Sequence, residues 1–426
     1  MNDASAQRIR LLDVSIAGKT AARLAHASTY TFDYLVDDPA QPWASLLMPA
    51  SAIHFEDGAL FPPMDMNLPE GYLFHQIRAM FPKQEITAMR LLALIGRNGI
   101  GRLGFQVPGL DQAPSAPVIS REAVRASRNG EALFQELTRA YLSTGMGISG
   151  LQPKLMLPDR VTVPIPTLIV KMGAAQYPGI SANEFLCLSA AAEAGIEVAS
   201  FELSDDGSLL MLDRFDIDAD GQRLGFEDVA ALMGLRVRDT LSDRKYQGSY
   251  QKIANLLKAI NLGAADLERF FEQVAFTAMV RNGDGHLKNF GVIYSNENDA
   301  RLAPMFDVVT TSIYKYARYD GGDDLEDRTM ALKLFSGRHA TKAYPTTEEL
   351  LAFGRNVCGV SRPEKALERI GDAMAAVLAR SRGDERIPGA LLRDMAEAWH
   401  EGLAMAHEAR RNAQHAVRSH RPRGAT

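Results

Sequence analysis

The sequence of 426 residues contains only two cysteines, Cys187 and Cys358, without CxxC or other metal-binding spacing. A disulfide framework is therefore not expected, and a reduced, cytoplasmic setting fits this usage best. The histidines show no HxxxH spacing, so we expect no zinc site. No stretch reaches the roughly 18 consecutive apolar residues of a membrane-spanning helix. The N-terminus lacks a charged start followed by an apolar run, so we expect no secretory signal and no membrane association.

An excess of charge of one sign is also absent. The 47 Lys and Arg against 52 Asp and Glu give a formal net charge of −5, so nothing draws the whole chain toward nucleic acid. A local exception is the basic C-terminal end, where we expect a solvated, disordered tail and where contact with DNA is the alternative. Its arginines are Arg410, Arg411, Arg418, Arg421 and Arg423.

The composition, with 46% hydrophobic and 23% charged residues, indicates a globular protein, and the length predicts two or three domains. We expect an N-terminal subdomain over residues 1–110, with strands at 11–16 and 30–36 around a turn at 17–19. A small lobe follows over 111–225, after a linker at 108–117 rich in Pro, Ala and Ser. Residues 226–426 are predicted to form a mainly helical lobe.

Within these segments the helices are predicted at 73–81, 87–95, 121–142, 182–194, 227–233, 250–260, 265–281, 347–355, 362–379 and 388–411. Strands are predicted at 167–171 and 209–213, and a hairpin at 290–307. This order of elements predicts an α+β protein in which a small sheet-containing lobe precedes a helical one.

The most informative segment runs from Arg281 to Phe290 and reads RNGDGHLKNF. It places an acid, Asp284, five residues before an amide, Asn289, on a loop punctuated by glycines. Phosphoryl transfer requires such a pair, because the aspartate orients the attacking hydroxyl and the asparagine helps to hold magnesium. The same residue types also favour ordinary turns, which is the alternative for this segment taken alone.

Two further residues stand where a phosphotransferase needs them. Asp307 ends the hairpin that begins directly after Asn289, where a carboxylate could chelate magnesium or simply cap the next element. Lys171 ends an apolar strand, from which it could reach nucleotide phosphates, and Glu184 on the following helix could pair with it.

Two more segments are candidates for nucleotide contacts. The glycine-rich stretch 145–154 could bring main-chain amides close to phosphates, although it is not a Walker A loop. The strand 209–213 runs into Asp213, Arg214 and Phe215, where an adenine-binding hinge would lie.

Taken together, the segments SGLQPK, IVK, ANEFLCL, LDRFD, GDGHLKNF and APMFD occur in this order over residues 149–307. This set resembles the HipA family, the kinase halves of bacterial toxin–antitoxin modules. The resemblance covers most of the chain and extends more loosely to Asn67–Gly71 and Ile95–Gly101. It implies a two-lobed, atypical protein-kinase-like fold with an N-terminal α/β subdomain.

The resemblance also implies roles for individual residues. Asp284 would be the catalytic base, with Asn289 and Asp307 as Mg²⁺ ligands. The residues implied in ATP binding are Lys171, Gly147, Ile148, Ser149, Gly150, Gln152, Lys154, Asp213, Arg214, Phe215, His286 and Lys288. Ser149 occupies the position that family members autophosphorylate, and a phosphate there would repel ATP and switch the enzyme off.

As a member of such a module, the chain would be an ATP- and Mg²⁺-dependent serine/threonine kinase. Its partners would be a HipB-like helix-turn-helix antitoxin, DNA only through that antitoxin, and a protein substrate such as an aminoacyl-tRNA synthetase. Two departures from the protein-kinase pattern leave alternatives open: Val308 and Val309 replace Phe-Gly after Asp307, and no His-Arg precedes Asp284. A small-molecule or lipid kinase is one alternative, and a degenerate, binding-only module is the other.

Overall fold

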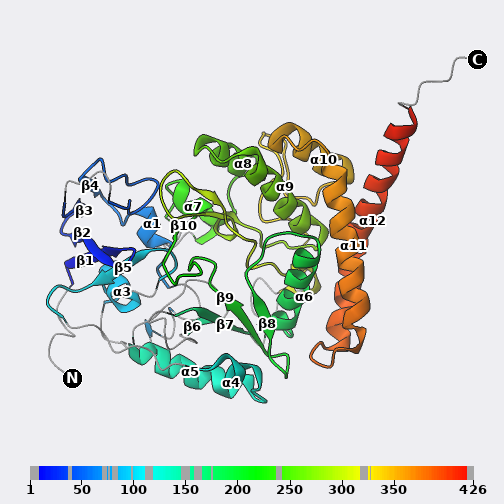
Figure 1. Cartoon of the computed structure of the whole chain (residues 1–426). Coiled ribbons are helices and arrows are strands. Elements are labelled where there is room, and N and C mark those ends of the chain that lie inside the picture. The colour runs from blue at the N-terminus through cyan, green and yellow to red at the C-terminus, as the bar shows by residue number, and fades with distance from the viewer. Residues whose placement is uncertain are drawn as a thin grey trace, which may run out of the picture. The chain divides into compact units, whose positions relative to one another are not determined.

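The computed structural model describes residues 9–36, 41–69, 74, 77–78, 85–96, 99–110, 119–144, 154–157, 166–173, 176–236, 242–316, 325–326 and 328–419. The chain forms two compact units, and each combines three stretches of sequence. The first unit draws on Met1–Ser181, Ala199–Lys245 and Gly291–Ala303, and the second on Ala182–Val198, Tyr246–Phe290 and Pro304–Thr426. Figure 1 labels the helices and strands of both units.

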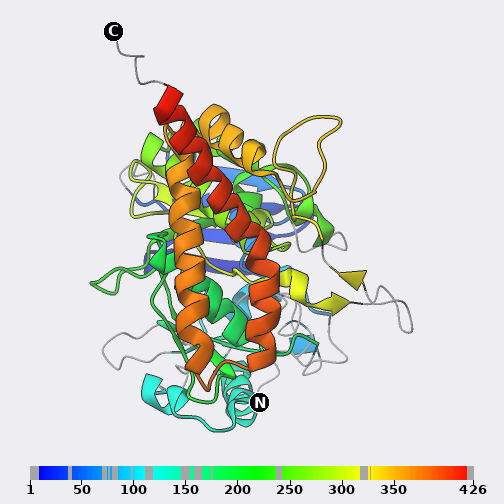
Figure 2. The same cartoon turned by 90° about the vertical axis from the view of Figure 1, so that its right-hand side faces the viewer.

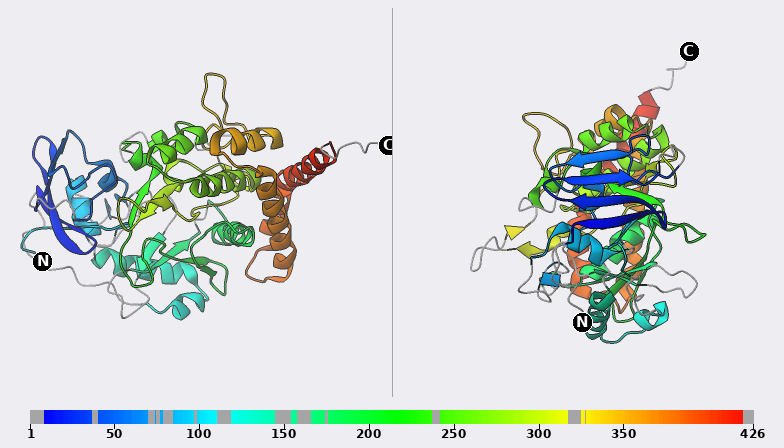
Figure 3. Two further views of the ribbon diagram at one scale, coloured as in Figure 1. Left: turned by 45° about the horizontal axis from the view of Figure 1, so that its top comes forward. Right: turned by 90° about the vertical axis from the view of Figure 1, so that its left-hand side faces the viewer.

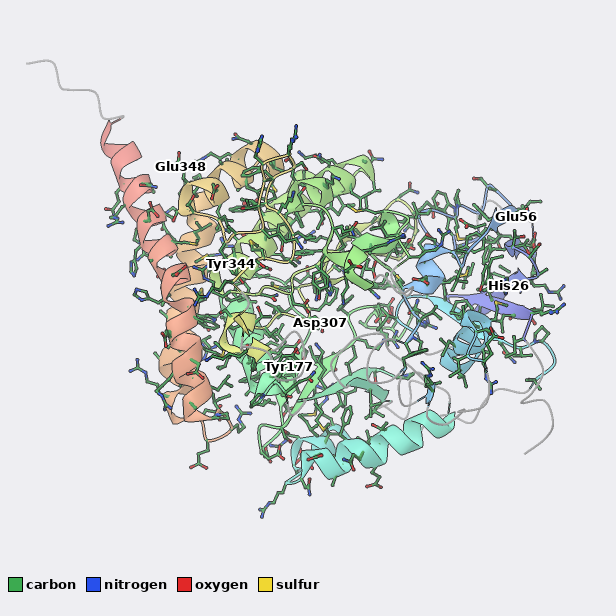
Figure 4. All side chains as sticks on the ribbon, turned by 180° about the vertical axis from the view of Figure 1, so that it is seen from behind. His26, Glu56, Tyr177, Asp307, Tyr344 and Glu348 are labelled. Carbon is green, nitrogen blue, oxygen red and sulfur yellow. The ribbon has the colours of Figure 1, made fainter. Side chains whose placement is uncertain are left out.

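An antiparallel five-stranded sheet begins the first unit, with strand order β4-β3-β2-β1-β5. Its blue strands lie side by side in the right panel of Figure 3, and His26 on β2 and Glu56 on β4 are labelled in Figure 4. The predicted turn at 17–19 is confirmed as a two-residue hairpin, because Ala17 and Gly18 both have positive φ, at 48° and 85°. The strands are β1 (Leu11–Ile16), β2 (Lys19–His26), β3 (Tyr30–Tyr34), β4 (His54–Asp57) and β5 (Leu103–Gln106).

A four-stranded antiparallel sheet, ordered β6-β7-β9-β8, forms the rest of this core. One hydrophobic cluster joins both sheets, from Leu12 and Phe32 to Val170 and Met211. The strands are β6 (Lys154–Leu157), β7 (Leu168–Met172), β8 (Phe201–Leu203) and β9 (Leu209–Asp213). The helices of this region are α1 (Pro62–Asp65), α3 (Ala88–Ile95), α4 (Arg121–Arg125) and α5 (Gly130–Thr144). The single helix predicted at 121–142 is thus wrong, because the chain breaks between α4 and α5, where the Arg125 carbonyl accepts from the Asp205 N–H.

A third sheet in the first unit joins β10 (Gly225–Asp228), β11 (Gly291–Tyr294) and β12 (Arg301–Leu302). The predicted hairpin after Asn289 is confirmed as β11 and β12. The helix predicted at 227–233 is wrong at its start, since β10 occupies these first positions and α7 covers only Val229–Leu232. The carboxylate of Asp228 accepts from the Ala231 N–H at 2.7 Å, and this N-cap places the boundary between the two elements.

The second unit is mainly helical. Its long helices are α6 (Ile180–Glu193), which begins in the first unit, α8 (Tyr250–Ala259), α9 (Ala264–Met279), α11 (Pro363–Arg380) and α12 (Gly389–Ser419). Short elements complete it: η3 (Leu287–Asn289), η4 (Thr311–Ile313), β13 (Lys315–Tyr316), β14 (Leu325–Glu326), α10 (Thr347–Ala352), the π-helix η5 (Phe353–Cys358) and η6 (Ser381–Gly383). Among the helices of the described residues, none is long and apolar enough to cross a membrane.

The helices α11 and α12 lie side by side, coloured orange and red in Figure 2. Gly371 permits this approach, since a Cβ at this position would lie 2.3 Å from the Cβ of Ala406. The expected disordered tail is wrong for its first part, because α12 continues to Ser419, and Arg410 binds both carboxylate oxygens of Asp372 at 2.9 Å. The residues beyond Ser419 lie outside the described part of the chain.

Candidate active site

The predicted catalytic loop follows directly after α9. Arg281 begins it in the left-handed conformation, with φ 57°. The Arg281 guanidinium stacks on the ring of Tyr344, 4.4 Å from its centroid, and forms an ion pair with Glu401 of α12. Tyr344 is labelled in Figure 4. A non-glycine residue in this conformation persists where its surroundings fix it, as these two contacts do here.

Hydrogen bonds hold the next residues of the loop. The Thr311 hydroxyl accepts from the Gly283 N–H at 2.7 Å, and the Asn282 side chain accepts from the Asp284 N–H at 3.0 Å. Tyr250 of α8 donates to the Gly285 carbonyl at 2.8 Å. A Cβ on Gly285 would come within 2.8 Å of Thr277 in α9, so this position requires glycine. The Asp284 side chain therefore stands on a firmly held main chain.

The carboxylate of Asp284 combines access to solvent with specific partners. Its side chain is 43% exposed, and its Oδ1 accepts from the Tyr246 hydroxyl at 2.6 Å. The ring of His286 is 8% exposed and places its Nε2 3.9 Å from the same oxygen. An accessible, oriented carboxylate is what a general base needs.

Asn289 and Asp307 are 18 positions apart, and the β11–β12 hairpin between them returns the chain so that they meet. The Asn289 amide donates to the main-chain carbonyl of Asp307 at 3.4 Å. Its other atom, Oδ1, is buried and has no hydrogen-bond partner among the described residues. Asp307, labelled in Figure 4, has φ 51°, a left-handed conformation that aspartate tolerates better than most residues.

This pair fits a magnesium ion. A buried amide oxygen without a hydrogen bond is costly unless another ligand satisfies it, and Mg²⁺ prefers such hard oxygens. No group of three or more His, Cys, Asp and Glu residues that could hold a metal occurs among the described residues. An active-site Mg²⁺ needs only one or two protein ligands, because substrate phosphates and water complete its shell.

The segment after Asp307 is clamped by the second unit's helices. Asn183 of α6 accepts from the Thr310 N–H at 2.8 Å and donates to the Thr310 carbonyl at 3.0 Å. Trp399 of α12 donates its indole N–H to the Thr310 hydroxyl at 2.8 Å. Burial raises the pKa of the neighbouring Cys187 thiol to about 12, so it stays protonated beside Thr310. These contacts fix the backbone three residues beyond Asp307.

The predicted phosphate-binding residues belong to the first unit. Lys171 lies in β7 and is 3% exposed, and its Cα is the register partner of Lys154 in β6. Glu184, its predicted partner, is fully buried in the part of α6 that belongs to the second unit, so the pairing stays a prediction. Gly147, Ile148, Ser149, Gly150 and Gln152 lie outside the described residues.

The predicted hinge residues all have partners within the first unit. Asp213 forms an ion pair with Arg121. Arg214 is buried, and its guanidinium donates to Asp216 at 3.0 Å and to the main-chain carbonyls of Pro166 and Gly99. Phe215 packs edge-on against Phe226, with ring centroids 5.4 Å apart. The side chain of Arg214 is thus occupied structurally, and the ATP contacts predicted for these three residues stay predictions.

Sequence reasoning missed several residues of this site. Tyr246, Thr310 and Thr311 contact the catalytic loop or the Asp307 segment, but none stands at a spacing that marks it. Asn183 directly precedes Glu184 in the sequence, but no pattern there indicates that its amide binds the main chain of Thr310, 127 residues away. Lys288 lies half-buried in η3, and its predicted nucleotide contact stays a prediction.

Comparison with known proteins finds two domain models and a solved structure that match this chain. A HipA N-terminal domain model matches residues 12–106, and a HipA-like C-terminal domain model matches residues 146–381, more than half of the chain. Among solved structures, the Shewanella oneidensis HipA in complex with HipB and its operator DNA superimposes with a TM-score of 0.65. That match covers 93% of this chain and 97% of that one at 17% identity, so it shows the two-lobed, mixed helix-and-sheet fold alone.

Curated relatives are similar over shorter stretches. "Putative kinase Y4dM" of Sinorhizobium fredii is 31% identical over 161 residues, 34% of this chain and 38% of that protein. A "Putative kinase" of Haemophilus influenzae is 29% identical over 186 residues, 40% of this chain and 54% of that protein. The matches thus span about half or less of these relatives. The HipA-like C-terminal domain model covers more than half of this chain, and the HipA N-terminal domain model matches the part before it. The chain therefore belongs to the HipA family.

Proposed function

We propose that this chain is an ATP- and Mg²⁺-dependent serine/threonine protein kinase that acts as the toxin of a toxin–antitoxin pair. One observation carries the proposal: Asn289 contacts Asp307, and its buried Oδ1 has no hydrogen-bond partner among the described residues, while the loop that ends at Asn289 also presents the accessible carboxylate of Asp284. A base next to a magnesium-binding pair is the minimal equipment for moving a phosphoryl group.

Within this proposal, each residue has one task. The Asn289 Oδ1 and the Asp307 carboxylate would hold Mg²⁺, which when bound neutralises charge on the ATP phosphates. Asp284 accepts the proton of the acceptor serine or threonine. Lys171, Lys154 and the 147–152 loop bind the phosphates, and Glu184 holds Lys171. Asp213, Arg214 and Phe215 line the adenine site, and His286 and Lys288 contribute further nucleotide contacts.

The partners follow from the family. The solved Shewanella oneidensis relative is a HipA bound to HipB and operator DNA, which supports a HipB-like helix-turn-helix antitoxin for this chain. DNA would be reached only through that antitoxin. The substrate would be a translation component such as an aminoacyl-tRNA synthetase, in the cytoplasm, so that the free toxin causes growth arrest and persistence. Phosphorylation of Ser149 would switch the kinase off, because a dianionic loop repels ATP.

A small-molecule or lipid kinase on the same scaffold is the second candidate, because the fold does not determine the acceptor. The departures at Val308, Val309 and before Asp284 fit an atypical kinase and leave this second candidate open. A binding-only module is less well supported, since Lys171, Asp284, Asn289 and Asp307 are all retained.

Mass spectrometry of the intact chain and its peptides, after incubation with ATP and Mg²⁺, tests the proposal. We expect one added phosphate at Ser149 in the wild type and none in Asp284→Asn, a nearly isosteric change that removes the base. Phosphate on a metabolite but on no protein would favour the second candidate. Absence of ATP binding would refute the assignment altogether.

A further inference from the structure

A tyrosine from outside the motif approaches the candidate base. Tyr246 ends η2 (Ser242–Tyr246), and its hydroxyl donates to the Oδ1 of Asp284 at 2.6 Å. Its ring meets the ring of His286 edge-on, with centroids 5.1 Å apart and planes at 77°. The ammonium of Lys342 lies 5.8 Å from the centre of the same ring. Tyr246 is therefore held by its ring as well as by its hydroxyl.

This contact matters because Asp284 is partly exposed. A carboxylate with 43% of its side chain exposed can rotate about its Cβ–Cγ bond unless a neighbour holds one of its oxygens. Hydrogen bonds to a charged acceptor are roughly twice as strong as neutral ones, so the phenol restricts that rotation. Tyr246 donates to Oδ1, and His286 Nε2 lies 3.9 Å from the same oxygen, so both neighbours act on one edge of the carboxylate.

We propose that Tyr246 is a positioning residue, which fixes Asp284 through Oδ1 so that Oδ2 receives the proton of the acceptor. The inference rests on the proposed kinase function and deepens it. In the step, the acceptor O–H bond breaks and its proton passes to Oδ2. The acceptor oxygen bonds to the γ-phosphorus of ATP, and the bond from that phosphorus to the β,γ-bridging oxygen breaks. ADP leaves with the electron pair.

The segment that carries Tyr246 supports the loop twice. Four residues later, Tyr250 donates to the Gly285 carbonyl at 2.8 Å, so two tyrosines bind two successive loop residues. One bond reaches the reacting side chain and the other reaches the main chain. A rival interpretation makes Tyr246 a plug that imitates the acceptor hydroxyl and must leave before a substrate binds. The ring contacts with His286 and Lys342 oppose such a departure.

The variant Tyr246→Phe keeps the ring and removes the hydroxyl. It should lower the rate of phosphate transfer if Tyr246 positions the base, and raise that rate if Tyr246 is a plug. The readout is ADP formation by the full chain with ATP and Mg²⁺, which counts transfer to the chain itself and to water. We expect the limiting rate to fall between about tenfold and about 100-fold, because a base misplaced by about 1 Å loses that much. The ATP concentration at half-maximal rate should not change, since Tyr246 acts on the base.

Two further variants make the test specific. Tyr250→Phe removes the neighbouring hydroxyl from a main-chain carbonyl, so it should lower stability more than Tyr246→Phe does and lower the rate less. In an Asp284→Asn background, adding Tyr246→Phe should have no further effect on the residual rate, because the tyrosine works through that carboxylate. Equal losses in both backgrounds would overturn the inference, as would an unchanged or faster Tyr246→Phe enzyme. A wild type that forms no ADP would instead refute the proposed function beneath it.

Discussion

The buried pair of Arg214 and Asp216 makes the stability of the first unit depend on pH. Both side chains are 1% exposed, and the Asp216 carboxylate also accepts from the Gly101 N–H at 2.6 Å. Burial alone would raise the pKa of Asp216, but the Arg214 guanidinium and this N–H hold it below its ordinary value of 3.8. A lowered folded-state pKa means that the stabilisation is complete above about pH 4. It is lost as the pH falls through the folded-state value.

We therefore expect Asp216→Asn to lower the free energy of unfolding at pH 7 by about 3–5 kcal/mol, because it leaves a buried guanidinium without its counter-charge. When the pH falls below about 4, the variant should also lose less stability than the wild type, since it lacks this titrating group. Urea unfolding at pH 7 and at a pH below 4 measures both free energies of unfolding. The exposed Asp220→Asn is the matched control and should stay within about 0.5 kcal/mol of wild type. Equal acid sensitivity of Asp216→Asn and wild type would contradict the argument.

Individual residues were predictable where chemistry imposes a spacing. The five-residue interval between Asp284 and Asn289, followed by Asp307 after a hairpin, pointed to a shared site, and the structure brings Asn289 and Asp307 into contact. Tyr246 could not be predicted, because its contact with Asp284 joins residues 38 positions apart that no local pattern connects. Arg214 was a nucleotide candidate by its position, but its carbonyl partners come from segments that no local pattern connects to it.

At the scale of elements, α6 holds the segment that follows Asp307. Asn183 satisfies both main-chain groups of Thr310, as a neighbouring strand would, and Trp399 holds the hydroxyl of the same residue. Thr310 is fully buried, so its N–H and carbonyl cannot turn to water if the amide is lost. The contacts of Asn183 and Trp399 with Thr310, here called the clamp, therefore tie the backbone that carries Asp307 to the position of α6.

We predict that Asn183→Ala lowers the free energy of unfolding by about 3 kcal/mol, because it leaves the buried N–H and carbonyl of Thr310 without hydrogen-bond partners. It should also reduce phosphate transfer between about tenfold and about 100-fold, as removal of groups that orient metal ligands does. Thermal unfolding and ADP formation, each measured over a Mg²⁺ titration, separate the two effects. The exposed Asn298→Ala serves as control and should change neither quantity. A stable, fully active Asn183→Ala protein would rule out a positioning role for the clamp.

Elements with strong periodicity were predictable and those defined by a partner were not. The helices α8, α9 and α11 and the strands β7 and β9 follow their apolar patterns to within a residue or two. The strand β10 was misread as the start of a helix, because its glycine and acids resemble an N-terminal cap rather than a strand. Its pairing with β11, more than 60 residues away, decides the matter. Long-range pairing of this kind leaves no signal within a local window.

For the whole molecule, the sequence does not show which stretches of chain make up each compact unit. Boundaries at residues 110 and 225 assume that each domain is one stretch of chain, and they stay predictions. The compact units combine three stretches each, because the hairpin 291–303 pairs with β10 in the first unit while the residues on either side of it belong to the second. A chain that passes repeatedly between units shows no composition change at each passage.

The charge of the whole molecule leads to a last prediction, about DNA. Affinity for DNA depends on cations that neutralise phosphates, whereas this chain carries a net charge of −5, and Arg410 in its basic end is already paired with Asp372. We therefore expect the chain alone to leave the fluorescence anisotropy of labelled operator DNA unchanged up to about 10 µM at physiological salt. The proposed HipB-like antitoxin alone should raise it, and both proteins together should raise it further. If the chain alone bound DNA, and replacing Arg421 and Arg423 by alanine abolished that binding, the basic end would be a direct DNA contact and the antitoxin would not be the sole link to the operator.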